Sequence, residues 1–230
     1  MITHLACIMD GNRRWAKQRG LQPWLGHREG IKALEHTIDF CLAKNIRHLS
    51  VYTFSVENLG RPTQEKHFLF DILAQEVKDQ ILKQMIEKNV RVCFVGDHSL
   101  FPTHLTPILK NIEAQTAHNT ALTVHSLFCY GGRQELLAAM KNIAKDVQIR
   151  RIEPEHITEQ TILDNLWSRD IPEPELIVRT GGSNRLSGFL PYQSAYSELY
   201  CTDVLWPDIT EKELEKAVTY FEQCKRNFGR

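Results

Sequence analysis

Short apolar runs alternate with longer amphipathic runs along nearly the whole chain, and this alternation restricts the fold more than any other feature. The runs rich in β-forming residues are 4–9, 48–54, 90–95, 122–129, 175–179 and 199–205, and the helical pattern occupies 30–44, 64–88, 107–118, 133–147, 158–167 and 210–227. Strand–helix–strand order with nearly continuous apolar strands is typical of a parallel sheet covered on both faces. The sequence therefore predicts an α/β fold, with a mainly parallel six-stranded sheet flanked by helices.

Length and charge restrict the organisation and the partners. The 230 residues, 42% of them hydrophobic, suit one domain over residues 1–230, and the two prolines in 170–174 indicate a loop inside it. The formal net charge is zero. A nucleic-acid partner held by a broad basic surface is therefore disfavoured, although clustered arginines can still bind a small anion.

The cysteines and the apolar runs indicate a compartment. None of the six cysteines forms a C-x-x-C pair, which favours reduced thiols over a zinc site. The first apolar run is too short for a signal peptide, and no run approaches the roughly 20 apolar residues of a membrane span. We expect a cytoplasmic protein that is at most peripheral at the inner face of the membrane.

Polar clusters follow several of the predicted strands, at the edge where open parallel sheets bind ligands. The first is "MDGNRRWA", in which Gly11 permits a sharp turn and the next helix begins with free N–H groups. A carboxylate beside phosphate is repelled unless a divalent cation lies between them, so Asp10 is interpreted as a magnesium ligand. An ordinary Asp-Gly turn with a helix N-cap is the alternative.

The second cluster is "TFSVENLGRP", after the second predicted strand. Ser55, Glu57 and Asn58 supply hydroxyl, carboxylate and amide groups, and Arg61 can bind phosphate as a planar fork. A simple capped loop would also account for this stretch.

The third cluster, "RTGGSNRLSG", places two arginines around a glycine pair without matching a P-loop. With it, four arginines are predicted at one edge of the sheet. Their convergence suits a substrate with several phosphate charges, and they are Arg14, Arg61, Arg179 and Arg185.

The motifs together resemble those of the cis-prenyltransferase family, most closely bacterial undecaprenyl diphosphate synthases, over essentially the whole chain. They are "MDGNRRWA", "GHREG", "YTFSVENLGRP", "VGD", "YGGRQEL", "IVRTGG" and "YSELYCTDVLWPD". The resemblance implies Mg²⁺-dependent, repeated cis addition of isopentenyl diphosphate to an allylic primer such as farnesyl diphosphate. The expected product is a long polyprenyl diphosphate, with undecaprenyl diphosphate, the lipid-carrier precursor for cell-wall synthesis, as the specific candidate.

The resemblance also implies roles for individual residues. Asp10 and Asn58 would be catalytic, and Asp10 and Glu198 would be metal ligands. The substrate-binding residues would be Gly11, Asn12, Arg13, Arg14, Trp15, His27, Ser55, Val56, Glu57, Leu59, Arg61, Arg179, Arg185, Leu186 and Ser187. It further implies a homodimer, with "SELYCTDVLW" and "RNFG" near the interface, and transient lipid contact when the product leaves.

Some positions depart from the family pattern. Arg13 stands where glycine is frequent, Pro23 replaces a phosphate-binding arginine, and Leu59 replaces a tryptophan. Arg19 and Arg28 are candidates to compensate for Pro23. Because a neutral amide is a poor base, we interpret Asn58 as a group that orients the diphosphate, which could itself take the proton.

The predicted helix 64–88 has a wider apolar surface than one core-facing stripe requires. It therefore predicts a hydrophobic tunnel for the growing chain, with plain core packing as the alternative. The apolar residues are Phe68, Leu69, Phe70, Ile72, Leu73, Val77, Ile81, Leu82, Met85 and Ile86.

Two other functions compete with the synthase. One is a catalytically silent partner that keeps the fold to support an active subunit, and the retained motif residues argue against it. The other is an unrelated phosphoryl-transfer enzyme, against which stands the lack of a P-loop lysine motif.

Overall fold

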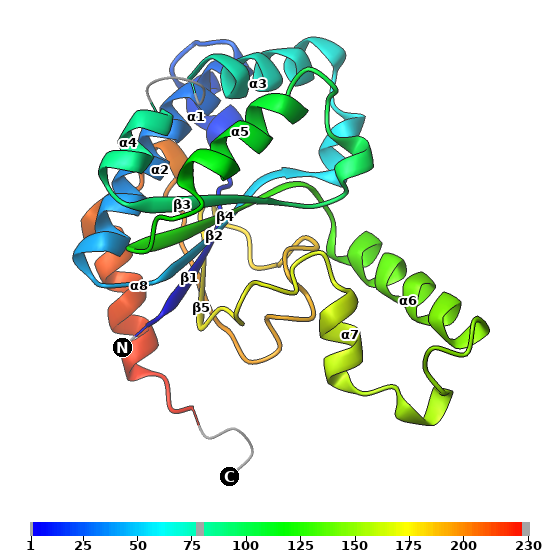
Figure 1. The fold of residues 1–230 in the computed structure, drawn as a ribbon. Coiled ribbons are helices and arrows are strands. Elements are labelled where there is room, and N and C mark those ends of the chain that lie inside the picture. Colours follow the sequence, from blue (N-terminus) through cyan, green and yellow to red (C-terminus); the bar gives the residue numbers. More distant parts are fainter. Residues whose placement is uncertain (1, 77–80, 227–230) are drawn as a thin grey trace.

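The computed structural model of the chain describes residues 2–76 and 81–226. Its centre is a six-stranded sheet in the order β3-β4-β2-β1-β5-β6, in which every pair of neighbours is parallel (Figure 1). The predicted α/β fold is therefore confirmed. The strands are β1 His4–Ile8, β2 His48–Ser55, β3 Val90–Val95, β4 Leu122–Tyr130, β5 Leu176–Arg179 and β6 Glu198–Cys201.

Helices cover one face of this sheet. Figure 1 shows α1 to α5 above the strands, and the main apolar core lies between the sheet and these helices, with α8 packed against α2 and β6. The helices are α1 Asn12–Gln18, α2 Gly26–Ala43, α3 Thr63–Glu76, α4 Leu82–Glu87, α5 Thr106–Thr116, α6 Gly132–Gln148, α7 Glu159–Asn165 and α8 Glu211–Gln223.

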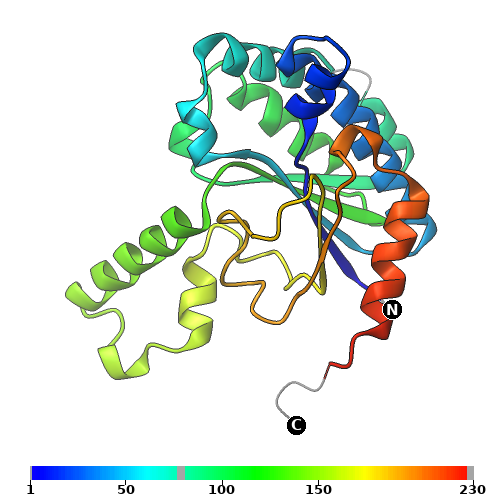
Figure 2. The same cartoon turned by 180° about the vertical axis from the view of Figure 1, so that it is seen from behind.

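The other face of the sheet is also covered, as expected, but mainly by irregular chain. Irregular segments before and after β5, between α7 and β6, pack on it, as Figure 2 shows from behind, and close a second, smaller core. Pro191 and the left-handed glycines after β5 do not favour a helix. The residues of the second core are Ala6, Ile8, Leu127, Tyr130, Ile171, Ile177, Phe189 and Leu190.

Several element boundaries also differ from the predicted ones. The helix expected from residue 30 begins at Gly26, because the short 3₁₀ turn η1 (Pro23–Leu25) leads directly into it. The predicted helix 64–88 is represented by α3 and α4, and residues 77–80 lie outside the described part. The sixth strand starts one residue early and ends at Cys201.

The C-terminal helix was also predicted too long. It ends at Gln223, because Cys224 has an extended backbone with φ −69° and ψ 129°. Residue 227, the last of the predicted helix, and most of the "RNFG" stretch lie outside the described residues.

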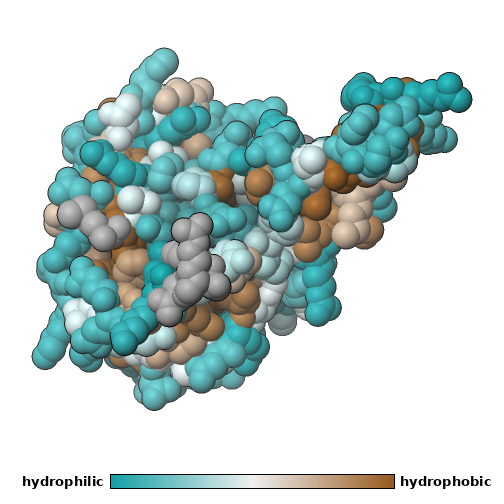
Figure 3. All heavy atoms as spheres, turned by 90° about the horizontal axis from the view of Figure 1, so that it is seen from below, coloured by the Kyte–Doolittle hydropathy of each residue, from teal (hydrophilic) through white to brown (hydrophobic). Residues whose placement is uncertain are grey.

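Helices α6 and α7 project from the body of the molecule (Figures 1 and 2). A buried carboxylate anchors the base of α6, since Glu135 accepts hydrogen bonds from the Tyr130 hydroxyl at 2.5 Å and the Ser168 amide at 2.9 Å. Figure 3 shows apolar side chains gathering where the projection meets the body, and on α6 itself Leu137 and Met140 are 52% and 63% exposed.

The structure bears on two further expectations, the lack of a membrane span and the reduced cysteines. Within 2–76 and 81–226, no helix has both the length and the apolar character needed to cross a bilayer. All six cysteines are free thiols.

Three histidine side chains cluster on the sheet, from β1, β2 and β4. His4 and His125 are almost fully buried, and the His48 and His125 rings stack with 5.4 Å between centroids. Burial, together with the neighbouring imidazoles, lowers the pKa of His4 to about 4 and that of His125 to about 3, and burial lowers the pKa of His48. The folded protein therefore holds this cluster neutral.

This cluster predicts a loss of stability in mild acid. Because these pKa values are lower in the folded state, the unfolded chain binds more protons below pH 6.5, the ordinary histidine pKa. The free energy of unfolding should have its full value above that pH. It should fall as the pH is lowered towards 4, by up to about 1.4 kcal/mol per pH unit for each histidine. Urea unfolding at several pH values measures this.

The matched variants are His125→Phe, which removes one buried imidazole, and His118→Gln, which changes an exposed one. The acid-induced loss should be smaller than wild type in the first and unchanged in the second. An undiminished loss in a folded His125→Phe protein would show that the cluster does not cause it.

Candidate functional site

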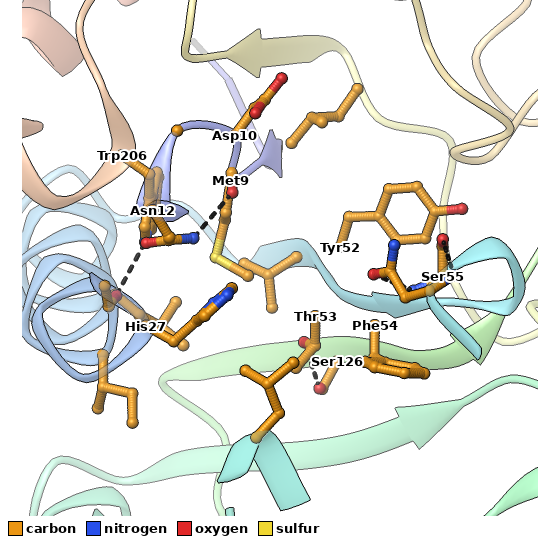
Figure 4. A pocket seen from close by; sticks show the side chains of 18 of the residues that line it. Met9, Asp10, Asn12, His27, Tyr52, Thr53, Phe54, Ser55, Ser126 and Trp206 are labelled. Carbon is orange, nitrogen blue, oxygen red and sulfur yellow. Dashed lines mark hydrogen bonds between the residues drawn. The ribbon is translucent and has the colours of Figure 1, made fainter. Parts of the chain in front are cut away.

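A cavity of about 790 Å³ lies between the sheet and the helices above it, and opens at the carboxyl ends of β1, β2 and β5. Its mouth is polar and its interior apolar. Figure 4 shows Asp10, Asn12 and His27 on one side of it and Tyr52, Thr53 and Ser55 of β2 on the other. The edge of the sheet selected from the sequence is thus where the cavity opens.

Asp10 follows β1 and is fixed on both sides. Its Oδ1 lies 3.1 Å from Arg14 Nη2, and its Oδ2 lies 3.0 Å from Arg179 Nη2. Its carbonyl oxygen accepts the Thr180 hydroxyl at 2.7 Å and the Trp206 amide at 3.0 Å. The carboxylate remains 32% exposed towards the cavity, so that a ligand can reach it.

Arg179, the last residue of β5, is the buried cation of the site, with a side chain only 4% exposed. Besides Asp10, its guanidinium donates to the Ser187 hydroxyl at 2.9 Å and to the Arg185 carbonyl oxygen. Its Nε has no hydrogen-bond partner within the described part of the chain. Arg179 therefore ties the turn after β1 to the loop after β5.

A second carboxylate, Glu65 in the first turn of α3, was missed by the sequence analysis. It is 3% exposed, and its Oε1 lies 3.2 Å from Arg61 Nη1 and 3.6 Å from Arg13 Nε. Both arginines line the cavity. The (i, i+4) spacing of Arg61 and Glu65 was a signal that could have revealed this pair.

The stretch after β2 forms a short capped helix, η2 (Val56–Gly60). Asn58 donates its backbone N–H to the Ser55 hydroxyl at 3.3 Å, and its side-chain oxygen accepts the Ser55 N–H at 3.2 Å. The capped loop proposed as an alternative is therefore present, and Ser55, Glu57 and Asn58 nevertheless line the cavity. With its oxygen engaged, Asn58 presents an amide donor.

Besides Arg179 Nε, two more buried polar atoms at the mouth have no partner among the described residues: Asn12 Oδ1 and His27 Nε2. Both residues line the cavity. Burial, with the nearby Arg61 and Arg13 charges, lowers the pKa of His27 to about 3, so the ring is neutral. Buried polar groups normally find a hydrogen-bond partner, and these two are available to a ligand.

Other predicted residues lie beside the cavity. The Trp15 indole donates to Asp208 at 2.7 Å, under the Arg19 guanidinium. The side chain of Arg185 is exposed, and the bond to Arg179 uses its carbonyl oxygen. Val56, Leu59 and Leu186 also lie outside the cavity lining. Leu59 packs against the main apolar core and Leu186 against the second, smaller core.

The structure does not bring Glu198 to Asp10 within this chain. Glu198 is the first residue of β6 and pairs in register with Leu176, whereas Arg179 at the other end of β5 pairs with Cys201. Glu198 therefore lies towards the amino-terminal edge of the sheet. Register could not be read from the "YSELY" motif.

Arg19, one of the two arginines expected to replace the phosphate contact missing at Pro23, does not line the cavity. Arg19 stacks on Trp15 and pairs with Asp208 at 3.3 Å, outside the cavity lining. Arg13 lines the cavity instead, and its ion pair with Glu65 places it beside Arg61.

The short helix α1, which follows Gly11, contributes less to anion binding at the mouth than the sequence suggested. Gly11 turns the chain with φ 117°, as predicted for the turn. However, α1 has only 7 residues, so its aligned peptide dipoles are few, and the arginines supply most of the positive charge at the mouth.

The interior of the cavity is apolar. Residues from α2, α4 and α5 face residues from β2, β3 and β4, and the Thr53 and Ser126 hydroxyls satisfy each other at 2.7 Å (Figure 4). Of the residues predicted to line a tunnel, Leu69, Ile81, Leu82 and Met85 do so. Phe70 belongs to the packed core, Ile86 is 43% exposed, and Val77 lies outside the described residues.

A preformed metal cage is absent from residues 2–76 and 81–226, which contain no cluster of three acidic, histidine or cysteine side chains suited to a metal. Mg²⁺ is commonly held by one or two carboxylates together with substrate phosphates and water. The partly exposed carboxylate of Asp10, at the mouth of an arginine-lined cavity, fits that arrangement as a single protein ligand.

Comparisons with known proteins identify the family of the chain. A family model described as "Putative undecaprenyl diphosphate synthase" matches residues 8–229. An isoprenyl transferase of Neisseria gonorrhoeae is 42% identical over 228 residues, which cover 99% of this chain and 89% of that protein.

Two further relatives have more specific names. A tritrans,polycis-undecaprenyl-diphosphate synthase (geranylgeranyl-diphosphate specific) of Methanopyrus kandleri is 41% identical over 99% of this chain and 84% of its own. The crystal structure of lavandulyl diphosphate synthase from Lavandula x intermedia, in complex with dimethylallyl diphosphate, superposes with a TM-score of 0.95 at 29% identity, covering 100% of this chain and 98% of that one.

The Asp10–Arg14 contact predicts a specific effect of Gly181→Ala. Gly181 has φ 82°, and an added Cβ would contact Arg14 Nη2 and approach the Asp10 carboxyl carbon to 3.2 Å. We expect a folded protein, with a melting temperature lowered by a few degrees, that binds inorganic diphosphate with Mg²⁺ more weakly in calorimetry.

Gly182→Ala is the matched control. Gly182 has φ 71°, so its backbone strain is similar, but an added Cβ would contact the Asp203 carboxylate instead. Equal losses of diphosphate affinity in the two variants would mean that backbone strain, and not the Arg14–Asp10 contact, is responsible.

Proposed function

Because the chain belongs to the undecaprenyl diphosphate synthase family of cis-prenyltransferases, it is an isoprenyl transferase, and we propose that it elongates farnesyl diphosphate with isopentenyl diphosphate. The proposed product is a long polyprenyl diphosphate, with undecaprenyl diphosphate as the specific candidate. The observation that carries the proposal is a cationic mouth over an apolar cavity, which matches a ligand with a diphosphate head and a hydrocarbon tail.

Condensation breaks a carbon–oxygen bond and leaves charge on the departing diphosphate. Arg13, Arg14 and Arg61 line the mouth, and their guanidinium groups would hold the allylic diphosphate through charge-assisted hydrogen bonds. Cations fixed in place stabilise the developing charge more than they stabilise the ground state. His27 Nε2 and the Asn58 amide would add neutral hydrogen bonds.

Arg179 and Ser187 are proposed to hold the incoming isopentenyl diphosphate, with Arg185 at the rim. Their mutual contact places a hydroxyl and a guanidinium beside Asp10. The two diphosphates would then lie on either side of one carboxylate.

The residues present fit Mg²⁺, and Asp10 would be its protein ligand. When bound, the ion would neutralise the diphosphates and stabilise charge on the departing oxygen. The position of Glu198 within the chain gives no support for the same ion being shared with Asp10.

The proton lost from the incoming unit needs an acceptor. Asn58 is a poor candidate, because its side-chain oxygen already accepts the Ser55 N–H and its nitrogen can only donate. The hydrogen bond to Ser55 fixes the Asn58 amide, which supports a role in orienting the diphosphate. We propose that the released diphosphate accepts the proton.

The apolar interior would receive the tail and exclude water from the reacting carbon. Each five-carbon unit buried there contributes roughly 4 kcal/mol at about 0.8 kcal/mol per methylene. Long products should therefore leave slowly, which supports transient contact with lipid at the end of the reaction.

We also propose a homodimer, for which the interface near "SELYCTDVLW" and "RNFG" stays a prediction, and α6 offers a further apolar surface. The exposed apolar side chains of α6, Leu137 and Met140, are of the kind that mark protein interfaces. Figure 3 shows further apolar surface beside the projection.

Asp10→Ala tests the assigned reaction. The variant should yield no butanol-extractable product from labelled isopentenyl diphosphate, farnesyl diphosphate and Mg²⁺, whereas the wild type should form it. Allylic diphosphate binding should persist, because Arg13 and Arg61 pair with Glu65 and not with Asp10, so the change leaves their contacts in place.

Asp39→Ala, which removes an exposed carboxylate outside the cavity lining, is the control and should remain active. Substantial activity of Asp10→Ala at saturating Mg²⁺ would contradict the role of Asp10. Absence of product with the wild type would contradict the function.

Product length should respond to the volume of the cavity. Val92 and Val124 are paired in register on β3 and β4 and both line the cavity. Val124→Leu and Val124→Phe should give progressively shorter products in thin-layer chromatography, with the first condensation retained. Val90→Leu, a buried position outside the lining, should leave the length unchanged. Identical product distributions in all variants would exclude this cavity as the tail site.

A further inference from the structure

Glu65 is a buried carboxylate that the proposed reaction does not use. Its side chain is 4% exposed and does not line the cavity, whereas Arg13 and Arg61, to which it is paired, do. A carboxylate buried this deeply is tolerated when cations and hydrogen bonds compensate it. The two arginines supply that compensation from different elements, α1 and the end of η2.

Asp10 and Glu65 are thus each placed between two arginines, and the two carboxylates differ in accessibility. The Asp10 side chain, between Arg14 and Arg179, is 32% exposed and open to a ligand. The Glu65 side chain lies behind its arginines. Its contacts can persist while the cavity is occupied.

We propose that Glu65 is a positioning residue, which holds the Arg13 and Arg61 guanidinium groups together so that both bind the diphosphate of the allylic substrate. This inference rests on the proposed function. Arg61 contacts Glu65 through its Nη1 atom, and Arg13 contacts Glu65 through its Nε atom. Since a guanidinium has five N–H donors in a fixed fork, each arginine keeps donors for phosphate oxygens.

The two guanidinium groups repel each other without this carboxylate. Burial and the charge of Arg13 lower the pKa of Arg61, and the charge of Glu65 opposes that change. Removal of Glu65 would leave two neighbouring cations uncompensated, and the more exposed Arg13, whose side chain is 46% exposed, can turn towards water. The two guanidinium groups would then no longer be held together for one diphosphate.

The sign of the effect distinguishes positioning from bulk charge. Deleting a negative charge near an anion site should strengthen anion binding if Coulomb attraction alone matters. Loss of positioning should weaken it. A measurement of diphosphate affinity therefore separates the two explanations.

The experiment compares Glu65→Gln, Glu65→Asp and Asp71→Asn with the wild type. The Glu65→Gln change keeps the shape and removes the charge, and Asp71→Asn removes one charge from an exposed position on the same helix. Calorimetry with inorganic diphosphate and Mg²⁺ should show affinity at least about tenfold weaker in Glu65→Gln and wild-type affinity in Asp71→Asn. Glu65→Asp, which keeps the charge but shortens the arm, should be intermediate.

Kinetics supply the second readout. KM for farnesyl diphosphate should rise in Glu65→Gln by a factor similar to the loss of affinity, with kcat within about threefold, because substrate binding is affected and the reacting atoms are not. Thermal unfolding checks that each variant is folded. If Glu65→Gln does not fold, Glu65→Asp decides the question. Weakened diphosphate affinity in that variant supports the inference, and unchanged affinity overturns it.

Unchanged or tighter diphosphate binding by a folded Glu65→Gln protein would overturn the inference while leaving the proposed function intact. If the wild type bound neither inorganic diphosphate nor farnesyl diphosphate, the proposed function would fail, and the inference with it.

Discussion

The ion pair between Arg179 and Asp10 is the interaction on which the site depends. A guanidinium buried at the end of a central strand is costly unless carboxylate and hydrogen-bond acceptors surround it. Asp10, the Ser187 hydroxyl and the Arg185 carbonyl supply them, from the turn after β1 and the loop after β5. The need to compensate one charge thus brings together segments that are distant in the sequence.

The division of the cavity into a charged mouth and an apolar interior follows from the parallel sheet. Strand ends place polar turns at one edge, while the strands behind them carry apolar side chains towards the covering helices. Because the Arg179 side chain is only 4% exposed, its contact with Asp10 is screened less than an ion pair on an open surface. In the proposed reaction, adjacent parts of one cavity would bind the diphosphate head and bury the hydrocarbon tail.

The sheet and the cavity edge could be predicted because they follow from local patterns. Alternation along the chain indicates strands and helices, and a parallel sheet brings the polar turns after them to one edge, as Asp10 and Ser55 illustrate. The position of Glu198 could not be predicted, because it depends on the register of β6 against β5. Glu65 was missed since its partner Arg13 is far away in the sequence, although its spacing from Arg61 was visible.

The central position of β1 has a consequence for how the protein is made. β1 pairs with β2 on one side and with β5 on the other, and Asp10 meets Arg179 across 169 positions of sequence. Closing so long a loop is among the slower events in folding. A nascent chain that has left the ribosome only as far as β4 has the aspartate without its buried partner. Prenyl transfer therefore has to wait until translation is nearly complete.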